Sequence, residues 1–247
     1  TIKEREKEAR FHMLEQLADY DDELMEQLLS DMQPPRDRIF DDLAKELRAG
    51  LICPVFLGAA EKGHGIMRLL KALRHETPFV ADTARRLKLE NARSAAYIVK
   101  TLYTGHGGKL SIARVLTGEI PDGATIVGAG GEERIAGIFS MLGEHSKKRA
   151  PAKAGDTVAL GRLEHMKTGE TVTTEKGGIV QIKSQPAPQP VYGVAMGLKD
   201  RKDEVKLSAA LSKLVEEDPS LVVELNQDTH QMLLLGQGEM HLRVALE

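Results

Sequence analysis

Glycine and proline turns divide residues 94–183 into short segments at regular intervals. The turns lie at Gly107-Gly108, Pro121-Asp122-Gly123, Gly130-Gly131, Gly155-Asp156 and Gly177-Gly178. The segments between them predict short strands, at residues 95–103, 110–116, 124–127, 133–139, 157–160 and 178–182. Short strands separated by regular turns are typical of a small antiparallel β-barrel.

Residues 1–80 follow a different pattern, in which apolar residues mostly recur at helical spacing. This spacing predicts helices over residues 1–50, with Asp21 and Asp22 as candidate caps and Gly50 at the C-terminal end. The continuous apolar run at 52–57 predicts a strand buried on both faces. A loop at 58–65 then leads into a helix that ends before Pro78. A strand, a tight loop and a helix make half of a doubly wound α/β unit.

Residues 189–247 predict the element order β-α-β-β-α. A strand at 191–196 follows a stiff linker that contains Pro186, Pro188 and Pro190. A helix begins at the candidate N-cap Asp203, strands follow at 221–225 and 232–235, and a second helix starts after Gly238. This order matches most of a ferredoxin-like split βαβ unit, without its final strand.

The composition of the 247 residues is that of a globular protein. Hydrophobic residues make up 41% and charged residues 29%, and a single cysteine excludes an intramolecular disulfide. The net charge of −3 argues against wholesale wrapping of nucleic acid. No apolar run is long enough for a membrane span, and the charged N-terminal stretch is not a signal peptide. We therefore expect a cytoplasmic protein that binds neither membrane nor DNA.

Common catalytic motifs are missing from the sequence. The phosphate-binding pattern G-x-x-x-x-G-K-[ST] is absent, because Gly108-Lys109 is followed by Leu110. Neither H-E-x-x-H nor G-x-S-x-G occurs, and Cys53 lies inside the apolar run, where we expect it to belong to the core. We therefore predict no catalytic residue and no metal ligand in this chain.

The loop at 58–65 is a candidate binding site. It follows the predicted buried strand at its carboxyl end, where open α/β sheets place ligands. The small residues Gly58, Ala59 and Ala60 let backbone N–H groups approach a flat acceptor such as a purine oxygen. The alternative is an ordinary turn between strand and helix that needs glycines for its geometry.

Several segments resemble the translation elongation factor G family, in the order in which that family carries them. They read ADYDDELMEQLL, CPVFLGAAEKGHGIMRLLKAL, GKLSIARVLTGEIPDGATI and LSAALSKLVEEDPSLVVELNQDTHQMLLLGQGEMHLRVALE. The most specific parts are Glu-Glu-Asp-Pro at 216–219 and Gly-x-Gly-Glu-x-His-Leu at 236–242. In that family, the loop that residues 58–65 resemble contacts guanine.

The resemblance implies a multidomain fold that combines α/β, all-β and α+β parts. Residues 1–80 would be the C-terminal part of a P-loop-type G domain with a helical insert. Residues 81–188, which begin with a charged connector, would form the β-barrel, and residues 189–247 a truncated ferredoxin-like third domain. The chain opens without Met and stops inside a helical pattern, so we expect a piece of a longer protein.

Some residues depart from the pattern of the family. Ala59 stands where the family usually has Ser, and Gly63-His64 replaces the expected Asn-Lys. Gln237 and Met240 replace an apolar pair, and Arg243 stands where an acidic residue is common. These departures favour a paralogue over the housekeeping factor.

Basic residues at two places are candidate contacts with ribosomal RNA or protein. The denser group is Lys147, Lys148, Arg149 and Lys153. The second group, Arg201 and Lys202 with Lys199 and Lys206 nearby, is interleaved with acidic residues. Lysine and arginine bind phosphates by charge without reading bases. The alternative interpretation is a solvated loop in the first case and an ordinary helix entry in the second.

Our leading hypothesis is a fragment of a ribosome-associated translational GTPase. The resemblance implies that the full-length protein, a monomer, uses GTP or GDP and Mg²⁺ and contacts RNA and protein of the small ribosomal subunit. Because the fragment lacks the phosphate loop, we expect it to hold no cofactor and to be inactive. The alternatives are a ribosomal protection or rescue paralogue and a non-enzymatic RNA- or ribosome-binding module.

Overall fold

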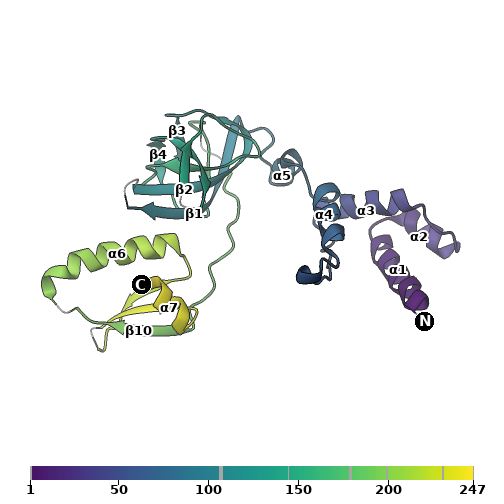
Figure 1. Cartoon of the computed structure of the whole chain (residues 1–247). Coiled ribbons are helices and arrows are strands. Elements are labelled where there is room, and N and C mark those ends of the chain that lie inside the picture. Colours follow the sequence, from purple (N-terminus) through teal and green to yellow (C-terminus); the bar gives the residue numbers. More distant parts are fainter. Residues whose placement is uncertain are drawn as a thin grey trace. The chain divides into compact units, whose positions relative to one another are not determined.

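The chain is a mixed α and β protein with several antiparallel sheets, seen here in a computed structural model (Figure 1). The structure describes residues 2–105, 108–143, 145–177, 180–198, 200–229 and 231–246, and for Ile2 and Arg201 only the backbone. Two compact units follow one another along the chain, Thr1–Arg86 and Leu87–Glu247.

The first unit is helical. Its α-helices are α1 (Ile2–Ala18), α2 (Asp22–Leu29), α3 (Arg36–Ala49), α4 (Ile66–His75) and α5 (Val80–Arg86). The first three pack around a small core of Leu14, Leu17, Ala18, Leu24 and Ile39.

Helix ends in this unit confirm the predicted signals. The Asp21 carboxylate caps α2 by accepting hydrogen bonds from the N–H groups of Glu23, at 3.1 Å, and Leu24, at 3.0 Å. Gly50 ends α3 in the left-handed conformation, with φ of 76°.

The predicted strand at 52–57 does not form. The segment is extended but belongs to no strand, Val55 is 83% and Leu57 88% exposed, and Cys53 is exposed rather than in the core. A strand needs a neighbour for its N–H and C=O groups, and among the described residues before Ser94 there is no strand to pair with it. The charged connector after residue 80 also differs from expectation, because it begins with α5.

The second unit contains a seven-stranded antiparallel sheet. Its strands are β1 (Ser94–Thr104), β2 (Gly108–Ile120), β5 (Ile138–Leu142), β6 (His145–Lys148), β7 (Ala152–Lys153), β8 (Thr157–Gly161) and β9 (Thr171–Val172). The strand order is β6-β5-β8-β2-β1-β9, and β7 pairs with β2. β3 (Thr125–Gly128) and β4 (Gly131–Arg134) form a separate hairpin, and Ile126 on β3 shares one buried apolar cluster with residues of the larger sheet.

The strand predictions for this unit hold with corrections. The predicted strand at 133–139 is divided between β4 and β5, and Gly137 between them has φ of 127°, which favours glycine. Residues 180–182 form no strand, and Gly178 and Ile179 lie outside the described residues, as do Gly107 and part of the turn at 177–178. Strands β6, β7 and β9 were not predicted, because their residues are basic or the strands are very short.

The C-terminal part of the second unit has the predicted order of elements. Strands β10 (Tyr192–Met196), β11 (Val222–Leu225) and β12 (Met232–Gly236) form a sheet in the order β10-β12-β11. Helices α6 (Glu204–Glu217) and α7 (Glu239–Leu246) contribute Leu211 and Leu242 to the core that Leu234 of this sheet completes. Asp203 precedes α6 as predicted, but its side chain makes no capping hydrogen bond.

Within the described residues, no helix combines the length and the apolar character that crossing a bilayer requires.

Glu46 on α3 is a buried carboxyl group in the helical unit. Only 2% of the residue is exposed, and its Oε2 atom has no hydrogen-bond partner. Burial, and next the charge of Asp42, raise the pKa of Glu46. Because the pKa of Glu46 is higher in the folded state, its contribution to the stability of the helical unit is greatest at low pH and is lost as the pH rises through that pKa.

We expect Glu46→Gln to stabilise the helical unit at pH 7 by about 1 kcal/mol, because the amide removes a buried charge. The gain should vanish at pH 4, where the native carboxyl is protonated. Amide hydrogen exchange of α3 at both pH values measures it, with the exposed Glu26→Gln on α2 as a neutral control. Equal protection of the native protein and the Glu46→Gln variant at pH 7 would contradict the expectation.

Candidate functional site

The predicted binding loop at 58–65 is a closed turn held by its own backbone. The Ala59 N–H donates to the His64 carbonyl at 3.0 Å, so this donor is used inside the loop. A short 3₁₀ turn, Ala60–Lys62, follows, and Gly63 and Gly65 adopt positive φ of 71° and 76°.

Close backbone packing explains the glycines of this loop. A Cβ atom on Gly58 would lie 2.8 Å from the His64 carbonyl oxygen, and one on Gly65 would lie 2.5 Å from that of Leu57. Both positions therefore require glycine for the geometry of the turn. Gly58 and Ala60 remain as the other two candidate donors that the sequence analysis named with Ala59.

The denser basic group lies on strands β6 and β7 and the segment between them. Lys148 forms an ion pair with Asp122 at 3.3 Å, and Arg149 forms one with Asp156 at 2.7 Å. Lys147 is exposed on β6, opposite Ser140 of β5. Asp122 is distant from Lys148 in the sequence, and Asp156 reaches Arg149 only through a turn. The sequence analysis therefore predicted neither ion pair.

The side chain of Lys153 on β7 is also exposed. This side chain makes no ion pair with a described carboxylate. The Asp156 carboxylate accepts from the Lys153 backbone N–H at 2.9 Å and pairs with Arg149. Among the described carboxylates, none forms an ion pair with Lys147 or Lys153, so these two lysines carry the available charge of this basic surface.

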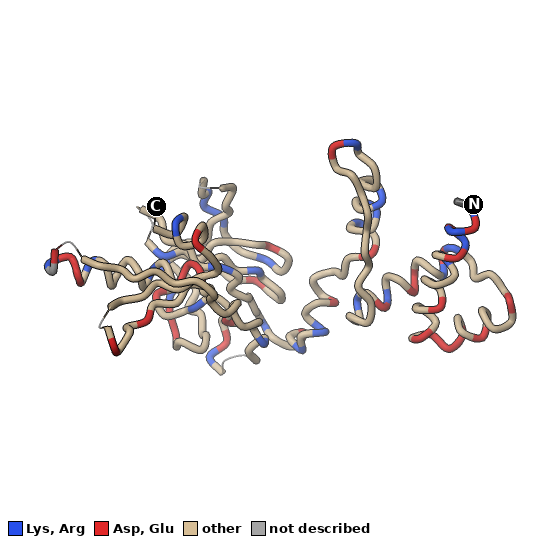
Figure 2. Tube along the Cα trace, turned by 90° about the horizontal axis from the view of Figure 1, so that it is seen from below, with Lys and Arg blue, Asp and Glu red and all other residues tan. Residues whose placement is uncertain are grey.

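The second basic group lies just before α6 and in its first turn. Lys202 forms an exposed ion pair with Asp200 at 2.8 Å, and Lys206 pairs with Asp203 at 3.1 Å. The side chain of Arg201 and all of Lys199 lie outside the described residues. Basic and acidic residues are interspersed along the trace (Figure 2). The described pairs reduce the charge available for phosphate contacts.

A buried lysine joins β2 to the end of α6, which sequence reasoning missed. The Lys109 side chain is completely buried, and its ammonium donates to the carbonyls of Glu164, at 2.9 Å, and Met166, at 2.8 Å. Its third acceptor is the Glu216 carboxylate. Three N–H donors therefore meet three acceptors, which is what a buried ammonium requires.

Tyr103, the cross-strand partner of Lys109, adds to this contact. Its hydroxyl donates to Glu216, its backbone N–H donates to Glu217, and Lys213 lies 5.3 Å above its ring. Burial, followed by the hydrogen bond to Glu216, raises the pKa of the Tyr103 hydroxyl, which stays protonated. We call Tyr103, Lys109 and Glu216 the α6 anchor.

The two most specific sequence patterns, at 216–219 and 236–242, contact each other next to the α6 anchor. Asp218 follows α6, and its carboxylate accepts from His241 Nε2 of α7 at 3.0 Å and from the Ser220 hydroxyl at 2.6 Å. His241 Nδ1 accepts from the Gln237 N–H at 3.0 Å, so the proton of the neutral ring sits on Nε2. Burial raises the pKa of Asp218, but hydrogen bonds from Ser220 and His241 outweigh it and the net shift is downward.

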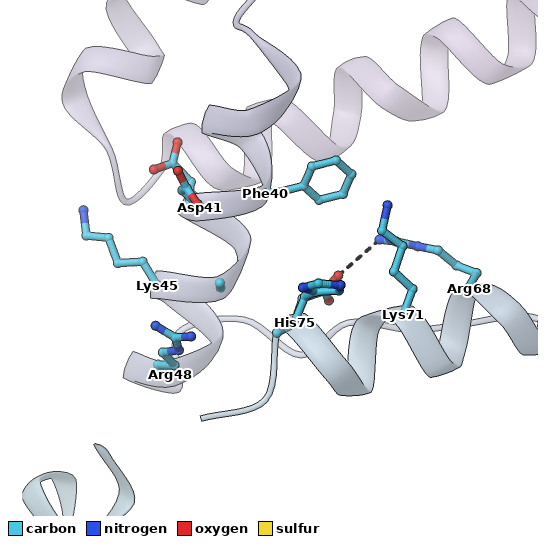
Figure 3. Close-up of a pocket in the computed structure, with 10 residues that line it drawn as sticks. Phe40, Asp41, Lys45, Arg48, Arg68, Lys71 and His75 are labelled. Atoms are coloured by element: carbon cyan, nitrogen blue, oxygen red, sulfur yellow. Dashed lines mark hydrogen bonds and ion pairs between the residues drawn. The ribbon is translucent and has the colours of Figure 1, made fainter. Parts of the chain in front are cut away.

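A hollow of about 530 Å³ lies between α3 and α4 in the helical unit (Figure 3). Lys45 and Arg48 line it from α3, and Arg68, Lys71 and His75 line it from α4. Phe40 of α3 projects into the space between the helices (Figure 3). Arg68 pairs with Glu76 at 3.4 Å. No cluster of three or more potential metal ligands occurs among the described residues.

Comparison with known proteins finds one family across the whole chain. Residues 187–247 match the family described as Elongation Factor G, domain III. An Elongation factor G-like protein of Synechocystis sp. is 44% identical over 98% of this chain and 36% of its own length. Elongation factor G of Fervidobacterium nodosum is 31% identical over 99% of this chain and 37% of its own length.

A solved structure shares the fold. A crystal structure of a protein from Thermus thermophilus superposes with a TM-score of 0.75 at 26% identity, covering 98% of this chain and 36% of that chain. The chain thus spans little more than a third of the length of these relatives.

We expect Lys109→Met to destabilise the second unit by about 3 kcal/mol, because Glu216 and two carbonyls lose their buried donor. Urea unfolding followed by circular dichroism measures the loss, and the exposed Lys100→Met on β1 is the matched control. Combining Lys109→Met with Glu216→Gln should cost less than the sum of the single changes. Strict additivity would show that the two side chains do not interact.

Proposed function

We propose that this chain, which belongs to the elongation-factor-G-like family, is the part of a translation factor that binds the ribosome. The observation that carries the proposal is the similarity over nearly the entire chain to proteins named elongation factor G or elongation factor G-like. The α6 anchor supports it, because the family-specific glutamate Glu216 makes a contact that holds two parts of the second unit together.

The finer domain assignment is part of this proposal. Residues 81–188 would form the β-barrel, supported by the antiparallel order of the larger sheet and its single apolar core. Residues 189–247 would form the ferredoxin-like domain, supported by the strand order β10-β12-β11. Residues 1–80 would be the end of a GTP-binding domain.

The longer protein would bind GTP or GDP with Mg²⁺, and the residues present here do not form that site. The sequence holds no phosphate-binding loop. In the loop at 58–65, the Ala59 N–H is already bonded to His64, which removes one of the three candidate backbone donors for a guanine.

We place the chain in the elongation-factor-G-like branch rather than with the housekeeping factor. Its identity is 44% to the Synechocystis protein, against 31% and 32% to elongation factor G of Fervidobacterium nodosum and elongation factor G 2 of Desulfotalea psychrophila. Ala59, Gln237 and Met240, which depart from the pattern of the family named in the sequence analysis, agree with this placement. The protein would act in the cytoplasm, where ribosomes are, as a monomer.

The basic surface on β6 and β7 would contact phosphates of ribosomal RNA. Removing the unpaired charges with Lys147→Gln and Lys153→Gln should weaken binding to small ribosomal subunits. The slope of log affinity against log salt should fall by about 0.7–0.9 for each lost phosphate contact. Co-sedimentation across a salt series measures both quantities.

The matched control carries the same change of charge on α1, as Lys3→Gln with Lys7→Gln. It should bind like the native chain. An unchanged salt slope in the β6–β7 variant would assign Lys147 and Lys153 to solubility alone.

We expect residues 1–247 to hydrolyse no GTP above the rate in buffer, because cradling of the phosphates, Mg²⁺ binding and water positioning need motifs that this sequence lacks. Phosphate release in the presence and absence of ribosomes is the measurement. Steady release that grows with protein concentration would be incompatible with the domain assignment.

A further inference from the structure

Both walls of the hollow between α3 and α4 present positive charge. Lys45 and Arg48 project from α3, and Arg68 and Lys71 from α4 (Figure 3). Like charges held on opposite walls repel one another, and an anion between them removes that repulsion. The volume of about 530 Å³ is typical of a site for a small molecule.

Three carboxylates, Asp41, Asp42 and Glu76, line the hollow together with its lysines and arginines, so the ion pairs decide which cations stay available. Glu76 is paired with Arg68 at 3.4 Å, and Asp42 lies 3.7 Å from Arg38, on the helix turn before. Asp41 is the remaining acidic residue of the lining. Among the described carboxylates, none forms an ion pair with Lys45, Arg48 or Lys71.

Aromatic rings hold these cations in place. Lys71 lies 5.3 Å and Arg68 5.7 Å from the centre of the Phe40 ring, and Arg68 also lies 5.7 Å from Phe56. Arg48 lies 5.9 Å from the ring of Phe79, and its Nε atom is buried without an acceptor. Cations positioned by rings have less freedom to lose when a ligand binds.

We propose that this hollow binds phosphate groups, and that its preferred ligand is a small molecule with two linked phosphates. Guanidinium and ammonium groups are the protein groups that recognise phosphate oxygens. Arg48 and Lys71 would contact the phosphates from opposite walls, and Arg68, already paired with Glu76, would act as a positioning residue for the Phe40 ring that Lys71 contacts. The residues of α4 that line the hollow run from Arg68 to His75, and no residue of the loop at 58–65 lines it, so the site is separate from the proposed guanine contact.

Titration of residues 1–247 with inorganic pyrophosphate at low salt tests the proposal. Nuclear magnetic resonance should show saturable shifts of amides in α3 and α4, and calorimetry gives the affinity. Replacing both contacts, with Arg48→Gln and Lys71→Gln, should weaken binding by about tenfold or more. The single Lys71→Gln variant should fall between, and circular dichroism checks that each variant keeps its helices.

The matched control is Lys62→Gln with Arg74→Gln, which makes the same change of charge on and just before α4, outside the lining. It should bind pyrophosphate within about twofold of the native chain. No saturable binding up to about 10 mM, or equal weakening in the control, would overturn the proposal.

A competition experiment identifies the source of the phosphates. If a short single-stranded RNA fails to displace pyrophosphate, the ligand is a small molecule, as proposed. If RNA displaces pyrophosphate with higher affinity, and the variant with Arg48→Gln and Lys71→Gln loses binding of both ligands, the hollow still binds phosphates but its ligand is RNA. If the variant binds RNA as the native chain does and neither protein binds pyrophosphate, the assignment is refuted.

Discussion

The buried ammonium of Lys109 is the contact on which the second unit depends. A charge removed from water is tolerated only when every donor is matched, and Lys109 meets two carbonyls and the Glu216 carboxylate. The contact also requires the register of β1 and β2, which sets Lys109 opposite Tyr103. A slip by one residue would turn Lys109 to the other face of the sheet, so strand pairing and attachment of α6 are coupled.

The family-specific residues around α6 have structural roles that follow one another along the chain. Glu216 binds Lys109 and Tyr103, Glu217 binds the backbone of Tyr103, and Asp218 binds His241 of α7. Neighbouring residues at the end of α6 thus contact both the larger sheet and α7. The packing of α6 therefore gives each of these carboxylates a structural role.

Local signals in the sequence were enough to predict most elements. Caps such as Asp21, C-terminal glycines such as Gly50 and the regular turns located helices and strands, because these signals act through neighbouring backbone groups. Where a feature depends on residues distant in the sequence, the prediction was wrong or was not made. The segment at 52–57 needs a pairing strand that the described residues do not supply, and the burial of Lys109 depends on carbonyls more than fifty positions away.

Charge shows the same division between local and distant information. Lys147, Lys148, Arg149 and Lys153 form one basic group in the sequence. In the fold, Asp122 and Asp156 pair with Lys148 and Arg149.

The helical unit gives the opposite case. Its cations are scattered through a sequence rich in acidic residues, yet α3 and α4 bring Arg48 and Lys71 to one hollow, where neither forms an ion pair with a described carboxylate. A net charge of −3 for the chain therefore says little about where an anion binds. What decides is which basic side chains the fold leaves without an acidic neighbour, because a paired cation must give up its partner before it can hold a phosphate.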